Sequence, residues 1–244
     1  MTFDVELDRA VRLEAFNWLN LQRGIYGDVL PRNVLEAGFI FQGSRVPIVG
    51  PQGIFKPALL PKIPLSITTI PGGPYDDDLR DGASVIHYRY RGSNQNHHEN
   101  VGVRLAQETQ TPLIYCYRVM PGRYVVSYPV FVCGDNPADL TFDIQLDDEI
   151  GLARYQSAKP EAVAAQETTL HRRYITTSAK RRLHQVAFRE RVLSAYETRC
   201  ALCRLGHGAL LDAAHIIPDS EAGGEPEVSN GLALCKIHHA ATQD

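Results

Sequence analysis

The 244-residue sequence has no stretch of about 18 uninterrupted apolar residues, the length that a membrane-spanning helix needs. Its first six residues include two acidic residues, Asp4 and Glu6, and lack the basic and then apolar pattern of a signal peptide. Positive and negative charges nearly balance, with a net charge of −3. The sequence has no internal repeat or low-complexity tract. Hydrophobic residues make up 44% and charged residues 22% of the chain, which excludes wholesale disorder and fibrous architectures. We therefore expect a cytoplasmic protein without a membrane partner.

The five cysteines are an odd number in a chain without an export signal. This argues against a disulfide framework and favours a metal site or free thiols. Three of the five cysteines and four of the nine histidines lie within residues 197–244. The C-terminal segment is therefore the first place to look for a functional site.

The pattern of residues along the chain predicts an α+β protein in four parts. Apolar residues in the first forty positions recur at roughly helical spacing, which predicts a small helical head over residues 1–60. A β-rich domain is expected over residues 61–150 and a helical linker, rich in Ala, Gln, Glu and Arg, over residues 151–184. The last part, residues 185–244, begins with apolar residues at helical spacing. The clearest strand-like runs are residues 84–90, 112–117, 124–132 and 140–146.

Two ligand pairs, Cys200 with Cys203 and Cys235 with His238, each have two residues between their members. Such a pair can direct both side chains at one point, so two pairs can close on one tetrahedral Zn²⁺. Four ligands with no open position indicate a structural zinc, which in so short a unit would supply much of the folding free energy. The alternative is two unrelated pairs of buried residues.

Between the ligand pairs lie the segments Leu-Asp-Ala-Ala-His-Ile-Ile-Pro (211–218) and Ser-Asn-Gly-Leu-Ala-Leu-Cys (229–235), followed by His238-His239. Residues 185–244 closely resemble the HNH nuclease family. The resemblance implies a zinc-stapled ββα-metal fold, a β-hairpin and then a helix, that grips a catalytic divalent cation, Mg²⁺ or Mn²⁺. It implies that His215 is the general base and that His239 binds the cation. It also implies that Asn230 orients the base or helps to hold the cation.

The sequence departs from the HNH pattern at two places. Ala214 stands where the family commonly has an Asp or His that binds the cation. Asp212 lies on the same side of an extended strand and is our candidate for the missing carboxylate. A further ligand is often found four residues after the position of His239, where this chain has Gln243. The alternative is therefore a modified-DNA-binding module whose HNH domain is degenerate or truncated and inactive.

The segment 172–191 contains seven Lys or Arg residues and one acidic residue. Such a run is usually a solvated face, but beside a nuclease core it favours contact with phosphates. We therefore expect contacts to the DNA backbone from Lys180, Arg181, Arg182, Arg189 and Arg191.

Residues 73–92 read Gly-Pro-Tyr-Asp-Asp-Asp-Leu-Arg-Asp-Gly-Ala-Ser-Val-Ile-His-Tyr-Arg-Tyr-Arg-Gly. Over about residues 65–135 the chain resembles the SRA family, PUA-like β-barrels that read 5-methylcytosine. A modified base is inspected by flipping it out of the duplex into a pocket with aromatic faces and a hydrogen-bond partner. The resemblance implies that Tyr75 and Tyr90 sandwich the base and that Asp78 binds the cytosine edge. The alternative is that the tyrosines are ordinary core aromatics and Asp78 belongs to a solvated turn.

A reader and a nuclease on one chain together predict a modification-dependent restriction endonuclease. Its partner would be double-stranded DNA that carries modified cytosine. Because one HNH site cuts one strand, we expect a homodimer. Two other hypotheses remain at this point: a modified-DNA-binding module that does not cut, and an HNH nuclease with no preference for modified DNA.

Overall fold

A computed structural model of the chain describes residues 4–71, 85–146, 155–156, 169–219 and 221–242, with the backbone alone over 169–181. The chain divides into two compact units, Met1–Lys180 and Arg181–Asp244. Helix α5 (Thr169–Ala195) continues from the first unit into the second. None of the described helices has the length and apolar character needed to cross a membrane.

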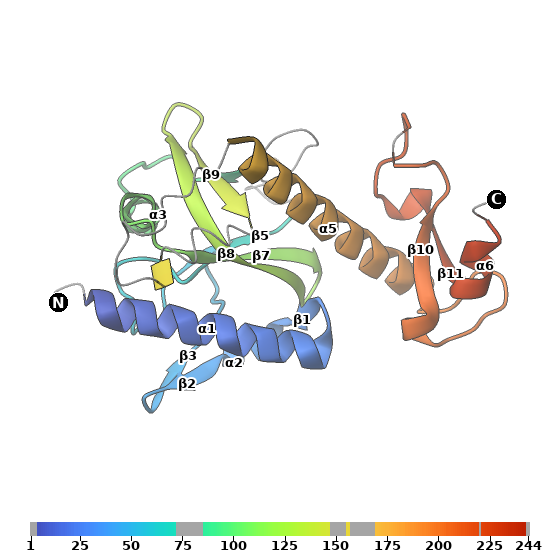
Figure 1. Ribbon diagram of the computed structural model, residues 1–244, viewed down its shortest axis with the longest axis horizontal. Coiled ribbons are helices and arrows are strands. Elements are labelled where there is room, and N and C mark those ends of the chain that lie inside the picture. Colours follow the sequence, from blue (N-terminus) through green and yellow to red (C-terminus); the bar gives the residue numbers. More distant parts are fainter. Residues whose placement is uncertain (1–3, 72–84, 147–154, 157–168, 220, 243–244) are drawn as a thin grey trace. The chain divides into compact units, whose positions relative to one another are not determined.

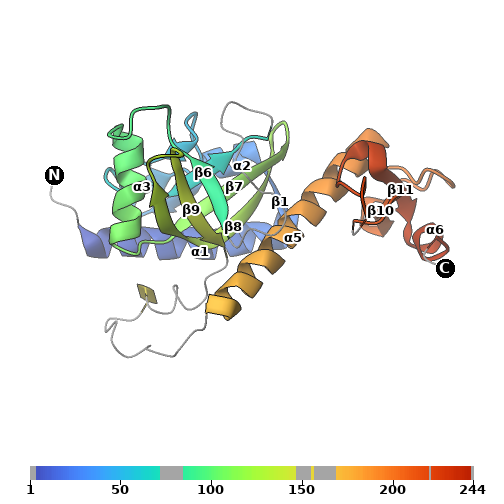
Figure 2. The same ribbon diagram turned by 90° about the horizontal axis from the view of Figure 1, so that it is seen from above.

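The first unit is built on a curled, half-barrel sheet of seven strands (Figures 1 and 2). Its strand order is β4-β5-β7-β8-β9-β6, and β1 also pairs with β8. The strands β5 and β7 are parallel, and the other described pairs are antiparallel. A separate two-stranded sheet joins β2 to β3. The strands are β1 (Val29–Pro31), β2 (Phe39–Phe41), β3 (Ser44–Val46), β4 (Ile54–Phe55), β5 (Ser66–Thr69), β6 (Ile86–Arg89), β7 (Leu113–Met120), β8 (Arg123–Asn136) and β9 (Thr141–Leu146).

The four strand-like runs of the sequence overlap β6, β7, β8 and β9. Residues 1–60 were predicted to form a helical head, but in the structure they contribute strands to the sheet as well as helices. The strands β1 and β4 come from this range and pair with the sheet. Helices α1 (Val5–Tyr26) and α2 (Arg32–Ala37) also come from it, and α3 (His98–Glu108) completes the helices described in the β-rich part of the unit.

Helix α1 begins at the N-cap Asp4, whose carboxylate accepts a hydrogen bond of 3.0 Å from Leu7 N. Its apolar side chains share one hydrophobic cluster with residues of β7 and β8. Leu21, which the sequence pattern placed in the helical stripe, is 67% exposed and does not join that cluster. The buried side of α1 is formed by Val11, Ala15, Phe16 and Leu19.

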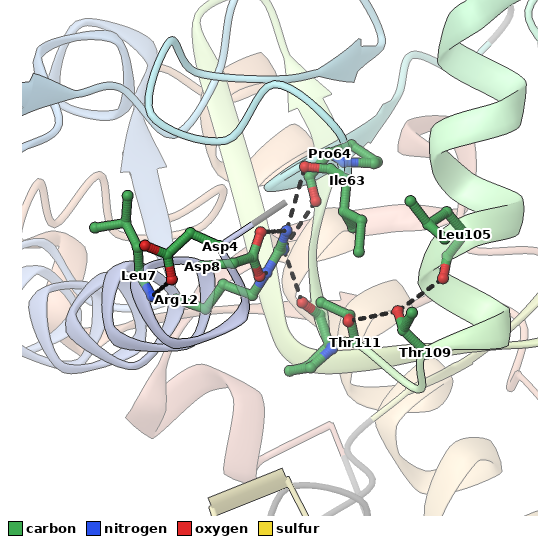
Figure 3. A network of polar contacts seen from close by, with 10 residues as sticks. Asp4, Leu7, Asp8, Arg12, Ile63, Pro64, Leu105, Thr109 and Thr111 are labelled. Carbon is green, nitrogen blue, oxygen red and sulfur yellow. Dashed lines mark hydrogen bonds and ion pairs between the residues drawn. The ribbon is translucent and has the colours of Figure 1, made fainter. Parts of the chain in front are cut away.

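The buried guanidinium of Arg12 connects α1 to two other segments of the first unit (Figure 3). Its Nε lies 2.6 Å from Asp8 Oδ1, one helical turn earlier. Its Nη1 donates to the carbonyls of Pro64 at 2.8 Å and Pro112 at 3.0 Å. Its Nη2 donates to Ile63 O at 3.2 Å. Because these carbonyls precede β5 and β7, Arg12 fixes where both strands enter the sheet.

The second unit contains the β-hairpin and the helix that the HNH resemblance implies. The strand β10 (Leu211–His215) pairs antiparallel with β11 (Gly231–Cys235), and α6 (Lys236–Ala240) follows directly. Two short 3₁₀ turns, η2 (Gly208–Leu210) and η3 (Val228–Asn230), lead into the strands. The apolar residues of α5 that the sequence placed at helical spacing form a core with the hairpin, and Phe188, Val192 and Leu193 are all buried.

Replacing Arg12 with methionine leaves the Asp8 carboxylate buried without its partner. We expect this to lower the free energy of unfolding of the first unit by about 3–5 kcal/mol. The matched control is Arg23→Met, which breaks the exposed Arg23–Asp28 ion pair and costs less than about 1 kcal/mol. Urea unfolding followed by the fluorescence of Trp18, the single tryptophan, measures both variants. Equal losses in the two variants would contradict the anchoring role of Arg12.

Candidate functional site

Cys200, Cys203, Cys235 and His238 bring one ligand atom each within 4.8 Å of one another. Cys203 Sγ and Cys235 Sγ are 3.8 Å apart, and His238 Nδ1 lies 3.4 Å from Cys200 Sγ and 3.3 Å from Cys235 Sγ. A tetrahedral zinc with Zn–S bonds of about 2.3 Å requires S···S distances of about 3.8 Å. Three thiol sulfurs and one imidazole nitrogen at this spacing therefore fit a structural Zn²⁺.

Backbone hydrogen bonds bring the two ligand pairs together. Ala201 N donates to Ala233 O at 2.7 Å, which joins the first ligand loop to β11. Burial raises the pKa of the Cys200 thiol, but backbone N–H groups, first that of Cys203, outweigh burial and lower this pKa to about 5. At Cys200 the loop thus favours the thiolate form that a metal requires.

His215 is the last residue of β10 and lies opposite Gly231 in the hairpin. Its ring stacks on Phe188, with ring centroids 4.1 Å apart and an interplanar angle of 20°. A Cβ atom at Gly231 would lie 2.3 Å from Val192 Cγ2, so α5 can approach this end of the hairpin only because residue 231 is glycine. Stacking on a helix side chain gives the imidazole a fixed plane.

The Nε2 atom of His215 is buried and, among the described residues, has no hydrogen-bond partner. A buried polar atom without a partner costs free energy, so such atoms are usually paired with protein, water or a ligand. The described residues therefore leave the hydrogen-bonding capacity of this nitrogen unused.

Asp212 and His239 lie together, as an oxygen and a nitrogen donor. His239 Nδ1, on α6, is 3.5 Å from Asp212 Oδ2, on β10, and both side chains are partly exposed. Strand alternation places Asp212 on the same face as Ala214 and places His215 on the other face. Ala214 itself is 8% exposed and packs in the hydrophobic cluster of the unit. One carboxylate oxygen and one imidazole nitrogen are donor types that could contribute to holding a divalent cation, and the carboxylate comes from Asp212 because residue 214 is alanine.

Asn230 is 8% exposed and binds the loop that follows His215. Its Oδ1 accepts from Ile217 N at 2.7 Å, and its Nδ2 donates to Ile217 O at 3.0 Å and to Glu225 O at 3.3 Å. Its backbone carbonyl accepts from Ile216 N at 3.0 Å. These contacts make Asn230 a clamp on the backbone directly beyond His215.

The arginines that we expected at the DNA backbone hold parts of the second unit. Arg189 Nη2 donates to Gly208 O at 3.0 Å and to Leu211 O at 2.8 Å, at the start of β10. Arg191 Nη2 donates to Pro226 O at 3.1 Å. Arg182 is exposed, whereas the side chains of Lys180 and Arg181 lie outside the described part of the chain.

The expected base pocket is only partly described, because Tyr75 and Asp78 lie outside the described residues. Tyr90 is 1% exposed, and its ring stacks on Phe142 with centroids 4.4 Å apart. Its hydroxyl donates to Asp135 and accepts from Arg104 Nη2 at 3.2 Å. The expectation that Tyr90 stacks on a flipped base does not agree with this burial. Its position instead matches the alternative interpretation of a core aromatic.

Three features of the site were missed at the level of sequence: the stacking of Phe188 on His215, the carbonyl contacts of Arg189 and Arg191, and the close approach at Gly231. Phe188 could be identified as apolar and helical, but nothing in the sequence paired it with residue 215. The glycine after Asn230 was a usable signal, because a strand residue without a side chain often marks a close approach of another element.

Comparison with known proteins agrees with this geometry. Residues 200–241 match a family model described as HNH endonuclease. The match supports a nuclease, a hydrolase of phosphodiester bonds. It contains the four Cys/His ligands, the hairpin and α6. No curated protein and no solved structure matches the chain.

Replacing Cys200 with serine should remove the metal, because the cluster loses a buried ligand. We expect one zinc ion per chain in the wild type and a much lower zinc content in Cys200→Ser, measured by inductively coupled plasma mass spectrometry on the purified protein. The matched control is Cys133→Ser, an exposed cysteine of β8, which should retain the metal. Wild-type protein without zinc, or full zinc in Cys200→Ser, would contradict the assignment.

Proposed function

We propose that the chain is a metal-dependent endonuclease that hydrolyses phosphodiester bonds of double-stranded DNA. In this proposal His215 is the general base, and Asp212 and His239 hold Mg²⁺ or Mn²⁺. The observation that carries it is the buried, unpartnered Nε2 of His215 within a segment that matches HNH endonuclease.

The chain's own groups would divide the chemistry as follows. In its neutral form an imidazole ring has one nitrogen that accepts a proton, so His215 can take the proton of the water that attacks phosphorus. Phe188 holds the plane of that ring, and Asn230 fixes the backbone beyond it. When bound by Asp212 and His239, the cation would neutralise charge on the phosphate and stabilise the leaving oxygen.

For the first unit we propose recognition of DNA that carries modified cytosine. The resemblance of residues 65–135 to SRA domains supports this, with Tyr75 and Asp78 as candidates for contacts to the flipped base. A curled sheet is compatible with the barrel that the resemblance implies. Tyr90 is not part of this proposal, because it is buried and its hydroxyl bonds to Asp135 and Arg104.

Two further parts of the proposal concern assembly and electrostatics. Since one site cuts one strand, a double-strand break needs two protomers, so we propose a homodimer. Lys180, Arg181 and Arg182 remain the candidates for phosphate contacts, because Arg189 and Arg191 donate to carbonyls within their own unit.

A second candidate function is a modified-DNA-binding module without hydrolytic activity. The specific observation in its favour is Ala214, which places a methyl group in the hydrophobic cluster where the family commonly has a cation ligand. Asp212 decides between the two functions, because it is the carboxylate that lies beside His239.

Plasmid cleavage separates these functions. We expect nicking and linearisation of plasmid bearing 5-methylcytosine in the presence of Mg²⁺ or Mn²⁺, measured by agarose gel. The rate should fall by about 10²-fold or more in His215→Ala, because the proton acceptor is lost. Asp212→Ala should also lose activity, whereas His207→Ala, an exposed histidine outside the hairpin, should cut like the wild type.

Each other result has a definite meaning. Retarded mobility without nicking would identify the binding module. Equal cutting of methylated and unmethylated plasmid would identify a nuclease without preference for modification. A strict monomer in sedimentation that still breaks both strands would contradict the dimer.

A further inference from the structure

Two large apolar side chains come directly after His215 and are held in solvent. Ile216 is 56% exposed and Ile217 is 39% exposed. At the opposite end of the hairpin Leu211 and Leu234 are buried, at 0% and 1%, whereas Leu210, which precedes β10, is 44% exposed. The end of the hairpin beside the proposed base thus exposes two adjacent apolar side chains.

The structure fixes this apolar pair in place. Asn230 binds both backbone groups of Ile217 through its side-chain amide and the N–H of Ile216 through its carbonyl. A surface segment whose backbone is already ordered loses little conformational entropy when it binds. The clamp thus prepares Ile216 and Ile217 for contact with another molecule.

The position of the pair identifies that molecule. If His215 activates water at a phosphate, as in the proposed function on which this inference rests, the next Cα is only about 3.8 Å further along the chain. We propose that Ile216 and Ile217 enter the minor groove beside the scissile phosphate and pack on its deoxyribose walls. Apolar side chains, isoleucine among them, are known to act as wedges in the minor groove.

The chemistry of the neighbouring residues favours this groove and limits the contact. The edges of the major groove are polar apart from the thymine methyl, so an aliphatic pair gains more from the sugars that line the minor groove. The loop that follows Ile217 would be repelled by phosphates, because it exposes four acidic residues and no basic one. These are Asp219, Glu221, Glu225 and Glu227. The contact therefore ends at Ile217 and is apolar rather than ionic.

The test measures binding without hydrolysis. Fluorescence anisotropy with the full chain and a duplex of about 20 base pairs, without Mg²⁺ or Mn²⁺, gives Kd over a series of salt concentrations. We expect the double variant Ile216→Ser/Ile217→Ser to raise Kd about tenfold, because apolar contact area is lost. The slope of log Kd against log salt should stay unchanged, since no phosphate contact is lost. A ligand that fills the minor groove should weaken wild-type binding more than binding of the double variant.

The matched control is Leu210→Ser, a 44% exposed leucine immediately before the far end of β10. It should leave Kd within about twofold of the wild type. Zinc content and thermal unfolding verify that both variants fold. Four results would each overturn the inference. They are an unchanged Kd in the double variant, an equal rise of Kd in Leu210→Ser, a changed salt slope in the double variant, and wild-type binding that does not respond to the minor-groove ligand. Plasmid hydrolysis is measured separately. If the wild type cuts plasmid but the double variant binds with unchanged Kd, only the minor-groove contact of Ile216 and Ile217 is refuted. If the double variant binds more weakly but the wild type does not cut, only the catalytic proposal is refuted.

Discussion

The convergence of three thiols and one imidazole is the constraint on which the second unit depends. The hairpin has two strands of five residues, and an isolated two-stranded hairpin is marginal in water. The Cys/His cluster closes the end at which Leu211 pairs with Cys235, while Asn230 closes the end at which His215 pairs with Gly231. Structural zinc contributes an apparent binding free energy of about 10–16 kcal/mol in small domains, enough to order such a unit. The catalytic proposal needs both closures, because the cluster carries α6 with His239 and the amide clamp holds the chain beyond His215.

The first unit solves a different problem, that of joining a long helix to a curled sheet. Arg12 makes this connection because its guanidinium donates hydrogen bonds to one carboxylate and three carbonyls, so that a buried charge is fully paired. Arg104 on α3 makes a second link of this kind, because its Nε lies 2.6 Å from Asp135 Oδ2 on β8 and its Nη2 donates to the hydroxyl of Tyr90, which follows β6.

Local patterns in the sequence predicted local features well. The two ligand pairs, the four strands β6 to β9 and the apolar face of α5 each follow from spacing within a few residues. Features that depend on tertiary packing were not accessible. Nothing local distinguishes a tyrosine that stacks on a base from Tyr90, which is buried against Phe142, or a phosphate-binding arginine from Arg189, which donates to two carbonyls. The strands that residues 1–60 add to the sheet were not predicted for the same reason, because the short strands β1 and β4 exist only through pairing with distant residues.

In the proposed mechanism, water activated at His215 attacks the phosphodiester bond. Cleavage of duplex DNA in ¹⁸O-labelled water, with mass spectrometry of the new phosphate ends, follows the oxygen of that water. We expect one labelled oxygen at each new phosphate and loss of both label and product in His215→Ala. Product ends without label, or labelled ends formed at an equal rate by His215→Ala, would contradict it.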